Sequence, residues 1–320
     1  MSSCGVFAKY FSEKCEKLGV SLKHKYNPYD SPLIMKVIDF LLLPSDIYKV
    51  SVDYKNRFGI YPNIVRPISF NDHIQHYKLF GRKNVHKIYA DKIKVRDHVA
   101  RVIGSEYLNE LLWVGTDIRE SRFVDLPNAF VIKANNGSGL NIIVNDINGL
   151  DWDRAHEKTQ AWMLGDLSLS FAEWQYRWIK PMLLIEKLLL DSDNEIPIDY
   201  KYFCFNGYVQ IVQLDLSRFK NHARLLLNRN FEVLPITYEY PKYDLPIRKP
   251  DNFEEMIMLA EKLAGDEPFI RIDFYDVGRP VFGEMTLHPG AGRERFSPHE
   301  WDLKFGEALS ISQRRRSLFC

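Results

Sequence analysis

Two acidic residues near the end of the sequence, Asp273 and Glu284, are placed like ligands for a divalent cation. Each lies in a short apolar run, at residues 269–275 and 281–285, and the residues between the runs include the Gly and Pro of a turn. A β-hairpin would bring the two carboxylates close together on adjacent strands. Because Mg²⁺ combines a few carboxylate oxygens with substrate phosphates, the pair predicts a Mg²⁺ site facing a phosphorylated ligand. The alternative is a solvated edge hairpin with surface acids.

A glycine-rich loop that follows a lysine is the second candidate site. The strand-like residues 130–132 lead through Lys133 into the loop 135–139, NNGSG, and the strand-like residues 142–144 follow it. Backbone N–H groups in such a loop can approach phosphate oxygens because the glycines carry no Cβ. The loop is not a P-loop, since it lacks GxxxxGK[ST] and no helix follows, and it is not a Rossmann fingerprint. A tight hairpin without a ligand is the alternative.

A charged pair, Glu186-Lys187, interrupts the apolar run at residues 182–190. A charge inside a buried strand needs either a partner or an opening to solvent, so one of these is expected here. The next predicted strand, residues 199–205, places Asp199 and Lys201 on one face, and an antiparallel alternation continues after it. The aromatic-rich stretch 162–180 is typical of a core, with stacking on a sugar or base as the alternative.

A helix is predicted before these strands, from Ser69 or Asn71 as N-cap to a stop at Gly81. Its histidines, His73 and His76, are expected on the solvated face.

A second predicted helix can be capped by Asp91 and ended by Gly104, with apolar positions on one side at Val95, Val99 and Val102. Three cations gather at its start, Lys92, Lys94 and Arg96. Such runs are usually solvated surface charges, and a phosphate-facing lysine is the alternative.

Other segments predict secondary structure but no chemical role. Residues 252–264 predict an amphipathic helix ended by Gly265, and residues 297–301 predict a helix start. The first 60 residues carry apolar positions compatible with a helix, and Arg314-Arg315-Arg316 predicts a basic tail.

The composition is typical of a soluble globular protein of 320 residues, with 46% hydrophobic and 13% aromatic residues. Lys plus Arg (43) nearly balance Asp plus Glu (42), which argues against a dedicated nucleic-acid binder. The four cysteines show no CxxC pair, so neither a disulfide framework nor a zinc site is expected, and a cytoplasmic location is the simplest expectation. The apolar run at residues 37–44 is interrupted by Asp39 and is too short to span a bilayer.

In their order, seven stretches resemble the ATP-grasp superfamily, and more closely its TupA-like branch, which is associated with bacterial surface polysaccharide synthesis. They are SFNDHIQHYK, YADKIKVRDHVARVIG, FVIKANNGSGLNIIV, WQYRWIKPMLLIEKLL, DYKYFCFNG, RIDFYDVGRPVFGEMTLHPGAG and FSPHEWD. The resemblance implies an α+β fold in which two α+β subdomains grip ATP, preceded by a mostly helical N-terminal region. The implied boundaries are 1–88 for the N-terminal region, 89–185 for the central subdomain, 186–310 for the C-terminal subdomain and 311–320 for the basic tail.

The resemblance also implies roles for individual residues. Residues resembling the nucleotide ligands are Lys92 and Lys133 for the phosphates, Asn136, Gly137, Ser138 and Gly139 for the closing loop, Glu186, Lys187, Leu188 and Leu189 for the adenine hinge, and Asp193 or Asp191 for the ribose. Asp273 and Glu284 resemble the metal-binding acids, and Arg271 and Lys201 resemble cations that steady the phosphates and the reaction intermediate. The third metal position is often Asn in this superfamily and is Thr286 here, so Thr286 or the nearby His288 would replace it.

The implied activity is that of an ATP- and Mg²⁺-dependent carboxylate–amine ligase with an acyl-phosphate intermediate. An acidic sugar or glycan carboxylate, such as a uronic acid, and an amine or amino acid are the expected substrates, and Arg293 or Arg295 could hold the acidic one. Neither a nucleic-acid partner nor a transmembrane segment is expected. The alternatives are a kinase-like phosphotransferase acting on a sugar and a glycosyltransferase, for which Asp191-Ser192-Asp193 formally fits a DxD motif.

Overall fold

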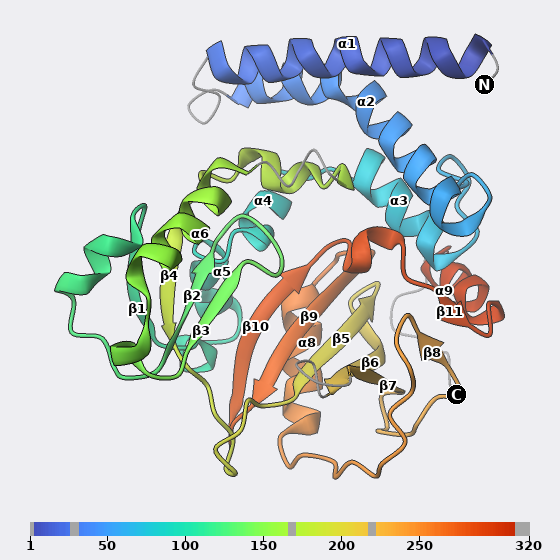
Figure 1. The fold of residues 1–320 in the computed structure, drawn as a ribbon. Helices are drawn as coiled ribbons and strands as arrows, with labels where there is room; N and C mark the ends of the chain where they lie inside the picture. Colours follow the sequence, from blue (N-terminus) through green and yellow to red (C-terminus); the bar gives the residue numbers. More distant parts are fainter. Residues whose placement is uncertain (1–2, 26–31, 166–170, 217–221, 311–320) are drawn as a thin grey trace.

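Two antiparallel sheets face each other, and helices cover their outer faces (Figure 1). The computed structural model describes residues 3–25, 32–165, 171–216 and 222–310. The predicted α+β organisation with a mostly helical N-terminal region is confirmed. The basic tail predicted at residues 314–316 lies outside the described residues.

The first sheet has the strand order β1-β4-β2-β3, with every pairing antiparallel. Its strands are β1 (Leu111–Gly115), β2 (Phe130–Ala134), β3 (Asn141–Val144) and β4 (Leu183–Lys187). One face buries Phe130, Ile132 and Ile185 in a core that includes side chains of α6 (Trp152–Leu164). Because side chains alternate along a strand, Val131, Lys133 and Ile143 point the other way, towards the second sheet.

The second sheet has the order β10-β9-β5-β6-β7, again antiparallel. Its strands are β5 (Asp199–Phe205), β6 (Tyr208–Leu216), β7 (Ala223–Leu227), β9 (Phe269–Asp276) and β10 (Pro280–Thr286), and a small pair is formed by β8 (Thr237–Tyr238) and β11 (Phe296–Ser297). Tyr202, Ile270 and Ile272 pack on α8 (Phe253–Ala264) behind this sheet. The predicted hairpin at residues 269–285 and the predicted helix at 252–264 are both confirmed.

The face of the second sheet that points away from α8 has an apolar end and a polar end. Phe203, Phe205 and Phe269 pack against α3 (Phe70–Phe80) and α9 (Glu300–Ser310) at the apolar end. Further along the same strands, Lys201 pairs with Asp273 in register, and both are buried. The strand alternation therefore leads directly from the hydrophobic core into a row of buried charges.

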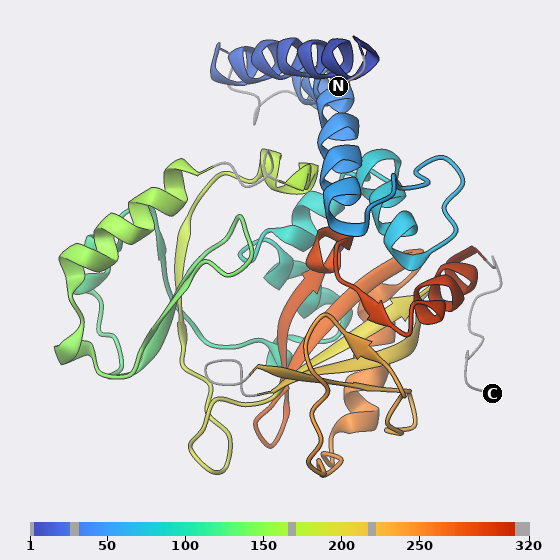
Figure 2. The same cartoon turned by 45° about the vertical axis from the view of Figure 1, so that its right-hand side comes forward.

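The N-terminal region is an antiparallel pair of long helices, of which α1 stands away from the two sheets (Figures 1 and 2). The α-helices among the described residues are α1 (Ser3–Lys25), α2 (Pro32–Phe58), α3, α4 (His86–Ala90), α5 (Val95–Val102), α6, α8 and α9. Ile38 and Leu42 of α2 pack on Trp174 and Trp178 of the 3-10 segment η5 (Trp174–Trp178). None of the helices among the described residues is long and apolar enough to cross a membrane.

Helix α3 shows where local sequence signals succeed and fail. Ser69 is its N-cap and accepts from the Asp72 backbone N–H, and the helix ends at Gly81, as predicted. The prediction that His73 lies on the solvated face is wrong, because this side chain is buried against α9 and its Nε2 lies 3.1 Å from Ser310 Oγ. The packing of α9 on α3 gives this helix a second buried side that its own periodicity does not show.

Candidate active site

An open cavity of about 680 Å³ lies between the two sheets. The first sheet and the segment that follows β4 contribute Val131, Lys133, Asn141, Ile143, Lys187, Leu188 and Leu189, and the other wall includes Ile196, Pro197, Asp199 and Tyr275. Mostly apolar walls with a few polar groups are typical of a small-molecule site. The cavity brings together Lys133 and the predicted hinge residues 187–189.

Glu186 at the edge of this cavity has two cationic partners. Its Oε2 accepts from Lys133 Nζ at 2.6 Å and its Oε1 accepts from Arg96 Nη1 at 2.8 Å. The Glu186 carboxylate therefore has two cationic partners, one of the two arrangements expected for a charge in a buried strand. The Lys187 side chain is exposed, and its Nζ lies 3.6 Å from Glu110 Oε2. The prediction that Arg96 is an ordinary surface charge is wrong, because it joins α5 to β4 through Glu186 and the Asn109 carbonyl.

The glycine-rich loop joins β2 to β3, and Lys92 reaches it from the chain before α5. Lys92 Nζ donates to the Gly137 carbonyl oxygen. Burial first, and Lys133 as a like charge, lower the pKa of Lys92, whereas Glu284 and Glu186 oppose the shift. Gly139 has φ of +73°, a conformation that favours glycine. Asn136 and Gly137 are buried, while Ser138 and Gly139 are exposed at the tip.

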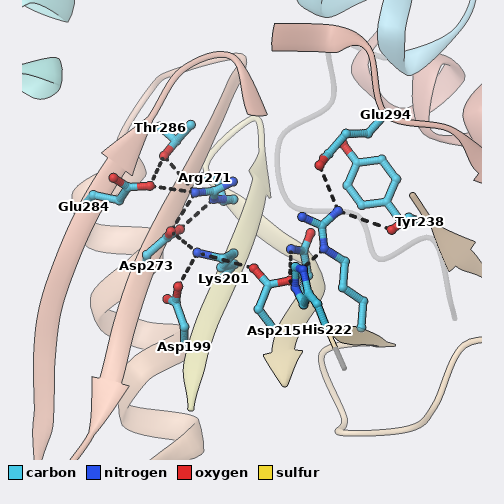
Figure 3. A network of polar contacts seen from close by, with 12 residues as sticks. Asp199, Lys201, Asp215, His222, Tyr238, Arg271, Asp273, Glu284, Thr286 and Glu294 are labelled. Carbon is cyan, nitrogen blue, oxygen red and sulfur yellow. Dashed lines mark hydrogen bonds and ion pairs between the residues drawn. The ribbon is translucent and has the colours of Figure 1, made fainter. Parts of the chain in front are cut away.

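Arg271 links the two predicted metal-binding acids (Figure 3). Its Nε and Nη2 donate to the two carboxylate oxygens of Asp273, each at 2.7 Å, and Nη2 also donates to Glu284 Oε1 at 2.8 Å. Thr286 Oγ1 lies 3.0 Å from both Arg271 Nη2 and Glu284 Oε1. The three residues predicted to bind a metal, Asp273, Glu284 and Thr286, are therefore all within hydrogen-bond distance of the Arg271 guanidinium.

A β-bulge decides that Glu284 faces this cluster. The register pairs Phe282 with Phe274 but Glu284 with Asp273, so Gly283 is the extra residue of β10. Phe282 and Met285 both pack in the core against α8 although they are three positions apart. Without the bulge, Glu284 would share the face of Phe282 and point into that core. A Cβ at position 283 would lie only 3.1 Å from the Asp273 carbonyl oxygen.

Lys201 extends the charged cluster across β5 towards β6. Its Nζ donates to Asp199 and, at 2.8 Å, to Asp273 Oδ2, and it lies 3.8 Å from Asp215. Burial alone would lower the pKa of Lys201, but Asp199 and Asp273 raise it above its ordinary value, so the ammonium stays charged. Burial raises the pKa of Asp273 to about 6 even though Arg271 and Lys201 act in the opposite direction.

The cluster as a whole carries an excess of carboxylates. Five acids belong to the network in Figure 3, Asp199, Asp215, Asp273, Glu284 and Glu294, and the permanent cations that contact them within it are Lys201, Arg224 and Arg271. Among the described residues, no three His, Cys, Asp or Glu side chains gather as a ready-made metal site. The oxygen donors and the negative excess suit a hard divalent cation that takes its remaining ligands from elsewhere.

Several predicted residues lie outside this geometry. Asp191 Oδ1 accepts from the backbone N–H groups of Asp193 and Glu195, which makes 191–195 a turn, and Asp193 is exposed. Arg293 lies 2.7 Å from Asp53 of α2, and Arg295 donates to the Arg57 carbonyl oxygen. The loop arginines thus both contact α2 in this structure.

Sequence reasoning missed other residues that shape the site. Asn135 holds the base of the glycine-rich loop, because its Nδ2 donates to Asp91 and to the Lys180 carbonyl, while its Oδ1 accepts from Met182. Asp215 and Arg224 continue the charged row, with Arg224 Nε donating to Asp215 at 2.7 Å. A charged residue at an inward position of a strand-like run was the available signal for Asp215 and Arg224, as it was for Lys201.

The combination of two facing antiparallel sheets, a lysine-bearing loop and a charged hairpin defines a nucleotide-binding class of fold. Residues 72–310 match the family model described as TupA-like ATP-grasp, so the chain belongs to the TupA-like ATP-grasp family. No curated protein sequence matches the chain significantly.

Solved structures that resemble the chain include ligases at low sequence identity. The L-amino acid ligase from Bacillus licheniformis aligns with a TM-score of 0.45 and 12% identity, over 75% of this chain and 55% of that chain. The D-alanine–D-alanine ligase from Helicobacter pylori aligns with a TM-score of 0.38 and 16% identity, over 72% of this chain and 60% of that chain. The chain therefore spans little more than half the length of these proteins.

Proposed function

We propose that the protein is an ATP-dependent carboxylate–amine ligase that forms ADP, phosphate and an amide. Family membership supports the ATP-dependent class, and the solved relatives include an L-amino acid ligase and a D-alanine–D-alanine ligase. The observation that carries the proposal is the Arg271 guanidinium, which lies between two carboxylates beside a cavity lined by Lys133 and the hinge.

In this proposal the cavity between the sheets holds the adenosine part of ATP. Backbone groups at 187–189 would contact the adenine edge, and the apolar Val131 and Ile143 would cover its face. Lys92 and Lys133 would neutralise the phosphates, and residues 136–139 would close over them. Asp199 lines the cavity and Asp193 does not, so Asp199 is the better candidate for the ribose hydroxyls.

Asp273, Glu284 and Thr286 would hold Mg²⁺. They supply hard oxygen donors in a region of excess negative charge, and with only two protein carboxylates the ion would keep ligand positions for phosphate oxygens and water. When bound, Mg²⁺ neutralises charge on the transferring phosphoryl group. The approach of ATP would draw Arg271 partly away from Glu284, because phosphate oxygens compete for the same guanidinium.

The chain's own residues then have defined tasks. The substrate carboxylate takes the γ-phosphoryl group, which gives an acyl phosphate, and an amine attacks the acyl carbon and expels phosphate. Arg271 would donate to the oxyanion of the tetrahedral intermediate, and Lys201 would keep Asp273 ionised and in place. For the acceptor we retain a uronic acid of a surface polysaccharide, on family resemblance alone.

A hydroxylamine trap tests the proposal. The protein is incubated with ATP, Mg²⁺, hydroxylamine and either glucuronic or galacturonic acid, and ADP, phosphate and hydroxamate are measured. A hydroxamate formed together with ADP and phosphate is expected, with loss of the product in Arg271→Ala and little change in Arg279→Ala at the exposed hairpin turn. A stable phosphorylated sugar without free phosphate would establish a kinase instead, and transfer from a nucleotide sugar would establish a glycosyltransferase.

A further inference from the structure

A second group of polar side chains, two of them buried and one partly buried, lies beside the Arg271 cluster, where β10 ends. Met285 and Leu287 pack in the core on α8, so Thr286 and His288 point to the opposite side, as Glu284 does. There His288 Nδ1 lies 3.9 Å from Glu173 Oε1, just before η5. The side chain of His288 is 4% exposed, and its Nδ1 has no hydrogen-bond partner among the described residues.

The third member of this group is Lys78 of α3, a lysine that is almost completely buried. It is 2% exposed, and its Nζ donates to the Ala291 carbonyl oxygen at 2.8 Å. Lys78 and Glu173 influence each other electrostatically, yet they form no ion pair within the described chain. By contrast, the buried cations Arg177 and Lys201 each contact carboxylates directly.

Neither charge forms a direct ion pair with a permanently charged side chain among the described residues, although Glu173 accepts a hydrogen bond from Gln175. Burial lowers the pKa of Lys78 to about 8, and burial raises the pKa of Glu173 to about 7. Burial, followed by the charges of Glu173 and Glu284, also raises the pKa of Tyr176, which places this tyrosine near both carboxylates. A buried cation and a partly buried acid that form no ion pair with each other, next to the phosphoryl-transfer cluster, suit a ligand carrying both charges.

We propose that Lys78, Glu173 and His288 form the site of the amine substrate, and that this substrate is an α-amino acid. The inference deepens the proposed ligase function and rests on it. Glu173 holds the ammonium group, Lys78 holds the carboxylate, and His288 Nδ1 contacts the bound molecule from the side of β10. The cluster thereby places the nitrogen next to the carboxylate that receives the phosphoryl group.

Glu173 also has a chemical task in this site. The ammonium gives one proton to the Glu173 carboxylate, and the freed lone pair forms the new bond to the acyl carbon. The bond from that carbon to the phosphate oxygen breaks, and phosphate leaves with the electron pair. The departing phosphate takes the second proton from nitrogen, which leaves a neutral amide, hydrogen phosphate and one proton on Glu173.

Hydroxylamine separates this inference from the proposed function, because it is largely uncharged at neutral pH and needs no base. Glu173→Gln is expected to keep hydroxamate formation within about threefold of the wild type, but to lower amide formation from the twenty common amino acids by about a hundredfold or more. Glu157→Gln on the exposed side of α6 is the matched control. An equal loss of both products in Glu173→Gln, or no loss of either, would overturn the role of Glu173.

Lys78→Met tests the carboxylate half of the site. This variant is expected to raise KM for the accepted amino acid by about tenfold or more, with no change for the corresponding amine without a carboxylate. Lys158→Met on α6 is the control. Unchanged discrimination between the two compounds would show that Lys78 only supports the turn at 289–292.

A binding experiment tests the amino-acid site independently of catalytic activity. The protein with Mg²⁺ and a non-hydrolysable ATP analogue is titrated with each of the twenty amino acids, and the Tm is recorded. At least one amino acid is expected to raise the Tm of the wild type, with no rise in Glu173→Gln. Failure of every amino acid to do so overturns the site, whereas a missing hydroxamate with intact amino-acid binding overturns the ligase function alone.

Discussion

Replacing Arg271 by Met should destabilise the protein substantially in the absence of Mg²⁺. The guanidinium provides two hydrogen bonds to Asp273, which is 2% exposed, and one to Glu284. Removing one partner of a buried ion pair costs about 3–5 kcal/mol, because the remaining charge is left without compensation. Lys201 stays on Asp273 and the Glu284 side chain is 32% exposed, so we expect the lower end, about 3 kcal/mol.

The loss should be visible in thermal and urea unfolding at neutral pH. With an unfolding entropy of about 2.1 cal/mol/K per residue, a chain of 320 residues loses roughly 1.5 °C per kcal/mol, so the Tm should fall by roughly 4–5 °C. Millimolar Mg²⁺ should recover part of this loss in Arg271→Met, because the cation supplies the positive charge that the two carboxylates have lost. The wild type should gain less, since its guanidinium already occupies the carboxylate oxygens.

Arg279→Met is the matched control, because Arg279 is exposed at the turn of the same hairpin and donates only to backbone carbonyls in the described chain. Its free energy of unfolding should change by no more than about 0.5 kcal/mol. A similarly small change in Arg271→Met would refute the reasoning, since the two carboxylates would then not depend on the guanidinium. A large loss that Mg²⁺ leaves untouched would refute the assignment of the cation site.

Three further predictions concern other groups. Lys133→Ala should weaken ATP binding, measured by calorimetry, by about tenfold or more because it removes a cation from the phosphates, and Lys158→Ala should not; unchanged ATP affinity would remove Lys133 from the site. Glu284→Gln should lower turnover by at least about a hundredfold and shift the Mg²⁺ dependence to higher concentration, with Glu307→Gln as the control, and near-normal activity would exclude the carboxylate as a ligand. Burial, helped by His76, lowers the pKa of His73 to about 4 in the folded protein, so as the pH falls below about 6.5 the unfolded chain takes up a proton that the folded protein refuses. Stability should therefore fall by about 2 kcal/mol between pH ~7.5 and pH ~5, and a His73→Gln variant that keeps the same slope would contradict this origin.

The sequence alone was sufficient for features that depend on neighbours in the chain. The Gly and Pro between two apolar runs predicted the hairpin, and Ser69 and Gly81 predicted the ends of α3. The charge of Glu186 in a buried run required either a partner or an opening to solvent, and the structure supplies partners. These signals are local, because turn geometry, helix capping and the cost of burying a charge act within a few residues.

Only the tertiary structure decided which distant residues meet. The partners of Glu186 are Lys133 and Arg96, which come from another strand and from a helix, and no spacing in the chain predicts such a meeting. The bulge at Gly283 turns Glu284 towards Arg271, whereas strict alternation would have placed it in the core. Lys78 lies beside the end of β10 because α3 packs on the turn at 289–292, where its Nζ reaches the Ala291 carbonyl oxygen. Side-chain direction and long-range packing depend on register and on the whole core, and this is the physical reason why the sequence names the charged residues but not their partners.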